Sequence, residues 1–362
     1  GLGDWTVNRD RLPNGIDGLA EKIEARGMKF GIWVELEMVN EDSDLYRAHP
    51  DWVLSVPGRR KSLGRSQCVL DFSRQDVVDN IYEQMAAILS SGKVSYVKWD
   101  MNRSITECWS HALPADRQGE VFHRYILGLY DLYERLTTKF PHVLFESCAS
   151  GGNRFDPGML YYAPQTWASD NSDAVERQKI QYGTSMCYPV SSMGSHVSVV
   201  PNHQMNRMTP LHTRANTAYF GTFGYELDLN KLTEEEIAEV KEQVSFMKEY
   251  REIFQYGTFY RLQSPFENNV MAWMSVSADR KTAIVGWYRT LNRVNYRFER
   301  VKLAGLLPDV LYENRRSGVR CYGDELMNYG LITTDGTAGE PIAENGLTVD
   351  FESRIYVLKA VE

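Results

Sequence analysis

The sequence predicts an α/β protein, a (β/α)8 TIM barrel that is incomplete, with about six βα units present, followed by a C-terminal antiparallel β-sandwich. Short apolar runs alternate with amphipathic helical stretches over residues 1–258, and several runs end in polar side chains. From about residue 259 the helical patterns stop and hairpin signals replace them. We therefore expect a barrel domain over 1–258 and a β-sandwich domain over 259–362.

The first barrel elements follow one another in a regular order. A helix is predicted over 15–27, where Gly27 ends it, and a buried strand over 28–37. Residues 41–71 form a long polar connection, which predicts a functional or disordered loop. A helix over about 74–91 then leads into a second strand at 94–100.

The rest of the barrel region repeats this alternation. Further strands are predicted at 142–148, 165–170 and 218–228, and helices at about 117–139, 173–184 and 233–254. The last helix begins with a capping box made by Thr233 and Glu236. In the second domain, residues 269–290 and 347–360 each predict a pair of strands.

The amino-acid composition indicates which kind of molecule this chain binds. The chain has 362 residues, of which 43% are hydrophobic and 24% charged, and its formal net charge is −8. There is no Lys/Arg-rich run, which argues against nucleic acid or an anionic membrane as the main partner. No apolar stretch reaches the length of about 18 residues that a membrane span needs. A small neutral substrate fits this composition better.

The cysteines and histidines give no sign of a metal centre. The cysteines are odd in number and scattered without CxxC spacing, which argues against a zinc site or a disulfide framework and favours a reducing, cytoplasmic compartment. They are Cys68, Cys108, Cys148, Cys187 and Cys321. His196 and His203 flank Pro201 and are not a helical pair, so we expect ordinary hydrogen-bonding roles for both.

The stretch "VSYVKWDMNR" (94–103) ends a predicted buried strand in polar residues. Lys98, Asp100 and Asn102 point to the same side if the chain stays extended. A cation beside Asp100 would lower the pKa of its carboxyl and keep it ionised, as a carboxylate nucleophile requires. The alternative is an ordinary turn or helix-cap carboxylate, which is the commoner role for such a residue.

A second carboxylate stands in "WASDNSDA" (167–174). Asp170 is predicted to end its strand close to Trp167, whose apolar ring would raise the pKa of the carboxyl, as a general acid needs. Asp173 matches a helix N-cap better. One ionised and one protonated carboxyl are the usual requirement for glycoside hydrolysis. Their separation, and hence the stereochemistry, does not follow from the spacing.

The glycine-rich segment "ESCASGGNRFD" (146–156) has several possible functions. It lacks the Gly-Lys-Ser/Thr of a P-loop and the spacing of a dinucleotide fingerprint, so close approach of the backbone to a small ligand is favoured over a phosphate site. Cys148 could also be a thiol nucleophile, although no histidine is placed to activate it.

Five motifs in order give the chain a family resemblance. They are "GMKFGIWVELEMVN", "YVKWDMNR", "ESCASGGNRFDPGMLYY", "WASDNSDA" and "VPNHQMNRMTPLHTR". Together they run along nearly the whole chain and resemble glycoside hydrolase family 36, the microbial α-galactosidases. The resemblance implies a retaining enzyme that removes terminal α-D-galactosyl residues from oligosaccharides such as melibiose and raffinose, without a cofactor or metal. The alternatives are an α-N-acetylgalactosaminidase, a galactosyl transferase, or a non-catalytic fragment that only binds sugar.

The resemblance also implies roles for individual residues. Asp100 matches the family's nucleophile, and Asp170 matches its general acid and base. The Cys148–Gly151 turn would face the C2 hydroxyl, which favours plain galactose over its N-acetylated form. The positions that match the family's galactose subsite are Trp33, Arg65, Lys98, Asn102, Cys148 and Gly151.

The chain departs from the family pattern in two places. Val34 and Leu36 stand where the family usually has Phe and Pro, beside the pocket wall. The family's N-terminal β-sandwich and first two barrel strands, with an aspartate pair that binds galactose, have no counterpart here. We therefore expect barrel units three to eight plus the C-terminal domain, a fragment of a longer product that would be a homo-oligomer in its full-length form.

Overall fold

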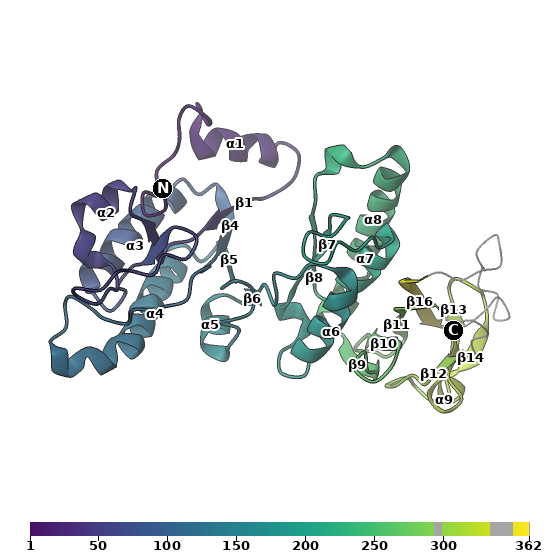
Figure 1. Ribbon diagram of the computed structural model, residues 1–362. Coiled ribbons are helices and arrows are strands. Elements are labelled where there is room, and N and C mark those ends of the chain that lie inside the picture. The colour runs from purple at the N-terminus through teal and green to yellow at the C-terminus, as the bar shows by residue number, and fades with distance from the viewer. Residues whose placement is uncertain (293–298, 334–349, 362) are drawn as a thin grey trace. The chain divides into compact units, whose positions relative to one another are not determined.

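The computed structural model describes residues 1–292, 299–333 and 350–361 of the chain. The chain divides into two compact units, Gly1–Trp167 and Ala168–Glu362 (Figure 1). No helix in the described part of the chain is both long and apolar enough to cross a membrane.

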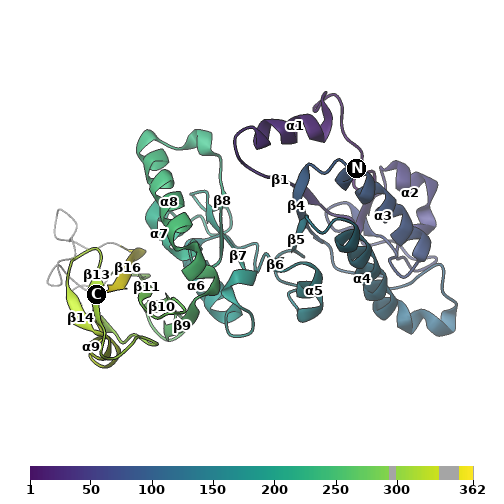
Figure 2. The same ribbon diagram turned by 180° about the vertical axis from the view of Figure 1, so that it is seen from behind.

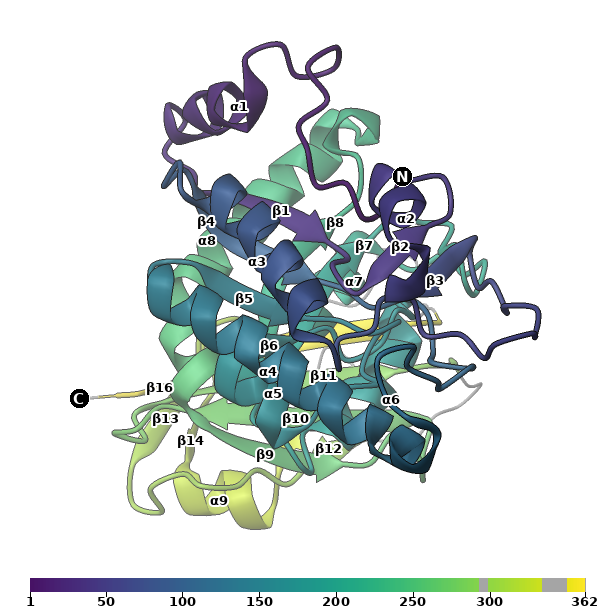
Figure 3. The ribbon, with the colours of Figure 1, turned by 90° about the vertical axis from the view of Figure 1, so that its left-hand side faces the viewer.

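The first unit is built on a four-stranded parallel sheet with the order β1-β4-β5-β6. Helices α3 and α4 lie over one face of this sheet (Figure 3). The strands are β1 (Phe30–Val34), β4 (Val94–Trp99), β5 (Leu144–Ser147) and β6 (Gln165–Thr166). The helices are α1 (Gly15–Glu24), α3 (Gln75–Leu89), α4 (Val121–Lys139) and α5 (Pro157–Tyr162), with two 3-10 helices, η1 (Pro50–Trp52) and η2 (Ala115–Glu120).

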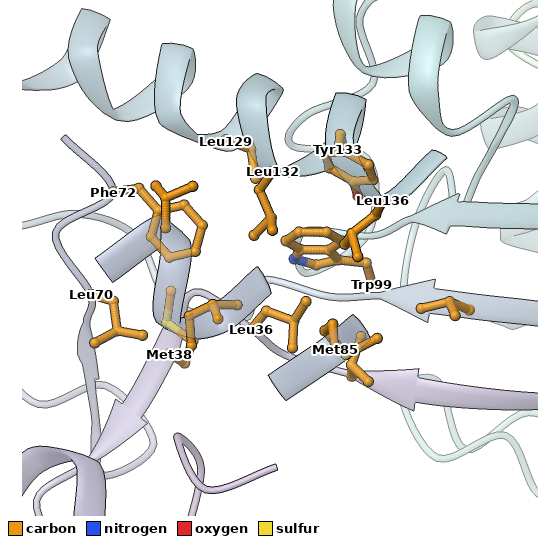
Figure 4. Close-up of a cluster of buried hydrophobic side chains, with 14 of the residues drawn as sticks. Leu36, Met38, Leu70, Phe72, Met85, Trp99, Leu129, Leu132, Tyr133 and Leu136 are labelled. Carbon is orange, nitrogen blue, oxygen red and sulfur yellow. The ribbon is translucent and has the colours of Figure 1, made fainter. Parts of the chain in front are cut away.

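The face of this sheet that meets the helices carries the core of the first unit. Because strand side chains alternate, Val97 and Trp99 of β4 point to this face. The Trp99 ring is fully buried and stacks on Tyr133 of α4 with ring centroids 4.2 Å apart. Figure 4 shows Trp99 beneath Leu132, Tyr133 and Leu136. This packing fixes the end of β4, where Asp100 follows.

The opposite face of the same sheet is more open. Trp33 of β1 and Leu144 of β5 are 46% and 43% exposed, while Tyr96 and Lys98 of β4 are half-buried between them. At Gly31, a Cβ would lie 2.9 Å from the Cβ of Tyr96, so this position leaves room only for glycine beside the tyrosine. The alternation of β4 therefore gives one packed face and one accessible polar face.

The connection over 41–71, predicted as a functional or disordered loop, contains regular secondary structure. This region contains α2 (Asp44–Ala48) and β3 (Gln67–Val69), and β3 pairs antiparallel with β2 (Met38–Asn40). Ser43 caps α2 by accepting a hydrogen bond from the Tyr46 amide. The short buried run around β3 was hidden by the charged residues before it.

The second unit begins with a parallel pair, β7 (Gly194–Ser198) and β8 (Thr222–Glu226), with α6 (Ala174–Thr184), α7 (Leu211–Ala218) and α8 (Glu234–Tyr256) around it (Figure 2). Two 3-10 helices, η3 (Val190–Ser192) and η4 (Leu229–Lys231), connect these elements. The capping box of Thr233 and Glu236 is confirmed. Neither β7 nor α7 was predicted, and the predicted strand 218–228 begins only at Thr222.

An antiparallel sheet with the order β14-β13-β16-β11-β10-β9 follows in the second unit. Its strands are β9 (Thr258–Gln263), β10 (Val270–Val276), β11 (Thr282–Arg289), β13 (Leu311–Asn314), β14 (Arg320–Tyr322) and β16 (Glu352–Ala360). The predicted hairpin is confirmed as β10 and β11. The second predicted pair, 347–360, contains β16, while 347–349 lie outside the described residues. A short pair, β12 (Arg300–Val301) with β15 (Leu331–Ile332), and helix α9 (Gly323–Asn328) complete this part.

The predicted fold class is thus confirmed in its broader form. Parallel strands alternating with helices come first, and an antiparallel sheet comes last. The described parallel strands are divided between a sheet of four and a separate pair.

Candidate functional site

Asp100 directly follows β4 and has three hydrogen-bond donors on its carboxylate. Its own amide donates to the Val34 carbonyl at 2.8 Å, which continues the β1–β4 ladder by one residue. Its Oδ2 accepts from Trp33 Nε1 at 3.2 Å and from Asn102 Nδ2 at 2.8 Å, and its Oδ1 accepts from the Met101 amide at 2.8 Å. The residue is only 7% exposed. A nearly buried carboxylate with three donors is held in one orientation.

Lys98 lies on the same face of β4 as Asp100, as predicted from strand alternation. Its Nζ is 3.0 Å from Glu146 and 4.8 Å from the centroid of the Trp167 ring. Glu146 is its partner in the β4–β5 register. The structure thus adds a feature that the sequence did not reveal, an ion pair across two strands next to Asp100.

Glu146 is a buried acceptor of several bonds on this face. Besides Lys98, it accepts from Gln165 Nε2 at 3.2 Å and from the Tyr96 hydroxyl. Burial, together with the negative charge of Glu146, raises the pKa of Tyr96, so the phenol stays a donor. Sequence reasoning overlooked Glu146. The available signal was a carboxylate within the strand itself, two residues before Cys148, where the register places it opposite Lys98.

The turn after β5 lies against the end of β4. The Cys148 amide donates to the Trp99 carbonyl at 2.8 Å, and the Ala149 amide donates to the Gly151 carbonyl at 2.8 Å. Ser150 and Gly151 have φ values of +47° and +84°, a tight turn that brings Ser150 Oγ to 3.4 Å from Asn102 Oδ1. Asn102 therefore connects this turn to Asp100.

The thiol of Cys148 is buried beside Asp100. Burial raises the pKa of this thiol, and the charge of Asp100 raises it further. Because the thiolate is the nucleophilic form, the alternative role of Cys148 as a nucleophile is disfavoured.

Arg65 occupies a different position from the other candidates. It is exposed and lies at φ +54° in the turn that leads into β3. Among the described residues, no hydrogen bond or ion pair joins Arg65 to Asp100 or to its three donors.

Two buried glutamates after β1 support the loop that follows Asp100. Glu35 Oε1 accepts from the Asn102 amide at 2.8 Å. Glu37 is fully buried and accepts from Arg154 Nη1 at 2.8 Å, from Trp99 Nε1 at 3.1 Å and from the Tyr125 hydroxyl at 2.5 Å. Glu35 thus binds the backbone of the Asp100 loop, and Glu37 binds the tryptophan that precedes Asp100.

The second predicted carboxylate, Asp170, lies in the second unit and in a different setting. The prediction that it ends a strand was wrong, because β6 ends at Thr166 and Asp170 stands in an exposed bend four residues later. Its carbonyl accepts from Gln204 Nε2 at 2.5 Å. The preceding carbonyl, that of Ser169, accepts from Arg177 Nη1 at 3.1 Å, and burial lowers the pKa of Arg177 to about 10.

The neighbouring Asp173 is the helix cap that the sequence predicted. Its Oδ1 accepts from the amides of Val175 and Glu176, at 3.1 and 3.0 Å, and it pairs with Arg207. Within the described residues, no group of three or more His, Cys, Asp or Glu side chains is arranged to hold a metal ion. His196 Nδ1 instead lies 3.3 Å from Glu226.

A carboxylate fixed at the carboxyl edge of a parallel sheet is the arrangement that barrel enzymes of the α/β class use for their active sites. Comparison with known proteins assigns the family. The Melibiase family model matches residues 1–257, and the model described as "Glycosyl hydrolase family 36 C-terminal domain" matches residues 270–358. The chain belongs to the Melibiase family.

Individual relatives agree with this assignment. Alpha-galactosidase AgaA of Geobacillus stearothermophilus is 54% identical over 361 residues, which is 100% of this chain and 48% of the relative. Alpha-galactosidase Mel36A of Lactobacillus acidophilus is 47% identical over 360 residues, 99% of this chain and 48% of the relative. The chain therefore spans about half the length of the curated relatives it matches.

Solved structures show the same coverage. The crystal structure of AgaA superposes with a TM-score of 0.94 at 54% identity, covering 100% of this chain and 49% of AgaA. The α-galactosidase from Lactobacillus brevis gives a TM-score of 0.96 at 48% identity, with 100% and 48% coverage. A variant of AgaA in complex with raffinose gives a TM-score of 0.95 at 53% identity, with 100% and 49% coverage.

Proposed function

We propose that this chain carries the catalytic residues of a retaining α-galactosidase, which hydrolyses terminal non-reducing α-D-galactosyl residues of oligosaccharides such as melibiose and raffinose. The observation that carries the proposal is the Asp100 carboxylate, fixed by donors from Trp33, Asn102 and the Met101 amide. Relatives at 47–54% identity are named α-galactosidases, which supports the same reaction. We also propose that the parallel strands are units of a (β/α)8 barrel domain over 1–258, with a β-sandwich over 259–362.

In the proposed first step, an Asp100 carboxylate oxygen attacks the anomeric carbon. The bond from that carbon to the leaving oxygen breaks, and Asp170 gives its proton to the leaving oxygen. In the second step Asp170 takes a proton from water, the water oxygen attacks the anomeric carbon, and the bond to Asp100 breaks. Two displacements on opposite faces return the original configuration, so no cofactor is required.

The three donors on Asp100 suit a nucleophile for a physical reason. They stabilise the anionic form and hold its orientation, so less reorganisation is needed when the substrate binds. Trp33 donates with its N–H while almost half of its surface stays exposed, which leaves its ring free to form an apolar wall for a sugar. Lys98 and Asn102 are proposed to bind sugar hydroxyls on either side of the nucleophile, as is Arg65 from its own loop.

The turn from Cys148 to Gly151 is proposed to select galactose. Its backbone follows the end of β5 closely and carries a buried thiol. A substituent larger than hydroxyl at C2 would need space beside this turn. We therefore expect much faster hydrolysis of an α-galactoside than of the matched α-N-acetylgalactosaminide.

The proposal is tested by hydrolysis of 4-nitrophenyl α-galactoside by the product of the complete gene. Asp100→Asn should lower kcat/KM by at least about 10³-fold, because a nucleophile contributes only in the transition state. Asp116→Asn, an exposed carboxylate on η2, is the matched control and should keep wild-type activity. Full activity in Asp100→Asn would contradict the proposal.

We further propose a reducing, cytoplasmic location and a homo-oligomeric complete protein. All five cysteines are free thiols, which supports a reducing compartment. The oligomer is inferred from the family resemblance, and light scattering of the complete protein would test it.

A further inference from the structure

Several side chains hold the loop that carries Asp170, and one of them, Gln204, is exposed and contacts the Asp170 backbone itself. Asp170 is four residues beyond β6, so no strand ladder fixes its backbone. Gln204 comes from the segment after β7 and makes three hydrogen bonds to this loop, one of which it accepts from the Ser172 hydroxyl at 3.4 Å. Its Nε2 donates to the Asp170 carbonyl at 2.5 Å, and its Oε1 accepts from the Ser172 amide at 3.4 Å. One amide group thus contacts the backbone on both sides of the Asp170–Ser172 stretch.

Gln204 is itself held in place by its own turn. Its amide donates to Asn202 Oδ1 at 3.1 Å, and the Asn202 amide donates to the Arg207 carbonyl at 3.0 Å. Asn202 is buried, and its Nδ2 donates to Ser172 Oγ at 3.2 Å. The turn and the Asp170 loop therefore form one hydrogen-bonded assembly, in which Gln204 is the member that contacts Asp170.

We infer that Gln204 is a positioning residue for the acid/base carboxylate, acting through the backbone of Asp170. This inference rests on the proposed function, since it takes Asp170 as the general acid. A general acid must reach the leaving oxygen within hydrogen-bond distance, and small displacements of a catalytic group cost large factors in rate. Because Gln204 is exposed, its loss removes little packing, so a rate effect can be separated from unfolding.

The test compares substrates that need the acid to different degrees. Kinetics with 2,4-dinitrophenyl α-galactoside, whose leaving group departs readily, are set against kinetics with melibiose, whose sugar alcohol needs protonation. In Gln204→Met, kcat/KM for melibiose should fall about 10- to 100-fold. The dinitrophenyl substrate should lose less than about threefold, because its departure needs little proton transfer. Both rates are measured on the product of the complete gene.

Three variants make the result interpretable. Asp170→Ala should show the same leaving-group dependence in a stronger form. Gln204→Glu keeps an acceptor for Ser172 but loses the donor to Asp170, so it should behave like Gln204→Met and replaces that variant if it does not fold. His203→Ala, an exposed neighbour on the same turn, should behave as wild type for both substrates.

The outcomes separate the inference from the function. Equal losses on both substrates, or no loss, in the Gln204 variants while Asp170→Ala depends on the leaving group would overturn the positioning role alone. If Asp170→Ala keeps wild-type activity on melibiose, or if the wild type hydrolyses neither substrate, the proposed function fails and the inference falls with it. Leaving-group dependence in both Gln204 variants, with His203→Ala unchanged, supports the inference.

Discussion

The two carboxylates proposed for the reaction are held in opposite ways. Asp100 is 7% exposed and is fixed by three donors directly on its carboxylate, at the end of a strand whose next residue back is a fully buried tryptophan. Asp170 is exposed, stands in a bend, and is held through its backbone carbonyl by Gln204. The Asp100 side chain is therefore restrained directly by its donors, and the Asp170 loop is restrained through its main chain.

This difference matches what the two proposed roles demand. A nucleophile must meet one carbon atom along one line, so a fixed carboxylate is an advantage. A group that first gives and then takes a proton must serve a leaving sugar and then a water molecule. The Asp170 side chain is exposed on a restrained backbone, so both the leaving sugar and the water molecule can approach it.

The largest expected effect is on the products of chemical rescue. The variants Asp100→Ala and Asp170→Ala each remove one carboxylate and should lower the rate of hydrolysis of 2,4-dinitrophenyl α-galactoside and of galactosides with poorer leaving groups. The loss in rate should be at least about 10³-fold for Asp100→Ala. Added azide should restore turnover in both but give opposite anomers. Azide replacing Asp100 attacks the substrate directly and gives the β-galactosyl azide, whereas azide attacking the galactosyl-enzyme of Asp170→Ala gives the α-anomer.

Proton NMR of the two azide products distinguishes these anomers. The wild-type protein with azide is the control and should yield galactose of retained configuration. The same anomer from both variants would contradict the division of roles between the two units.

A large effect on stability is expected at Glu37, which anchors the Asp100 region. Glu37→Gln leaves the Arg154 guanidinium largely buried without its counter-charge, and breaking such a pair costs about 3–5 kcal/mol in the free energy of unfolding. Urea unfolding measures this loss. Adding Arg154→Met should recover part of it, because the unpaired charge is removed as well.

A substitution in the second unit supplies the control for the Glu37→Gln unfolding experiment. Gln204→Met removes an exposed contact in the Asp170 loop and should cost less than about 1 kcal/mol. If the two substitutions cost the same, the contrast between a buried and an exposed support would be wrong.

A smaller effect is expected at the ion pair beside Asp100. Glu146→Gln keeps the shape but removes the charge opposite Lys98, which is 25% exposed at its side chain and therefore partly solvated. We expect a loss of about 1–3 kcal/mol in the free energy of unfolding, measured in urea. The substitution Glu176→Gln, at a half-exposed glutamate of α6, provides a matched comparison and should cost less.

The sequence predicted features that depend on neighbouring residues in the chain better than it predicted contacts between residues far apart in the chain. Strand alternation placed Lys98 and Asp100 on one face of β4, and capping chemistry identified Asp173 and Thr233, because these features depend on neighbours in the chain. The Trp33 donor to Asp100 and the Glu146 partner of Lys98 come from other strands, so their identities depend on register. Glu146 could not be assigned to Lys98 until β4 and β5 were aligned.

The incorrect predictions for β6 and α7 have a similar cause. The end of β6 was placed too late because a run of mixed residues after Thr166 resembles a strand but lacks a partner to extend the ladder. Helix α7 was missed because its apolar residues are few and its buried face contains Thr213, Arg214 and Thr217. Polar burial of this kind is satisfied by tertiary hydrogen bonds, which no pattern along the chain records.

The smallest expected effect concerns the reactivity of the Cys148 thiol. It tests how well the turn beside Asp100 excludes solvent and reagents. Cys148 is buried and its pKa is raised by burial and by Asp100, whereas Cys187 is exposed in the second unit. Alkylation depends on the thiolate, so at pH 8 iodoacetamide should label Cys187 well before Cys148. Peptide mass spectrometry over a time course measures both rates, and labelling in denaturant should make them similar. Equally rapid labelling in the native protein would mean that the turn after β5 opens readily, and the tight support assigned to Asp100 would then have to be abandoned.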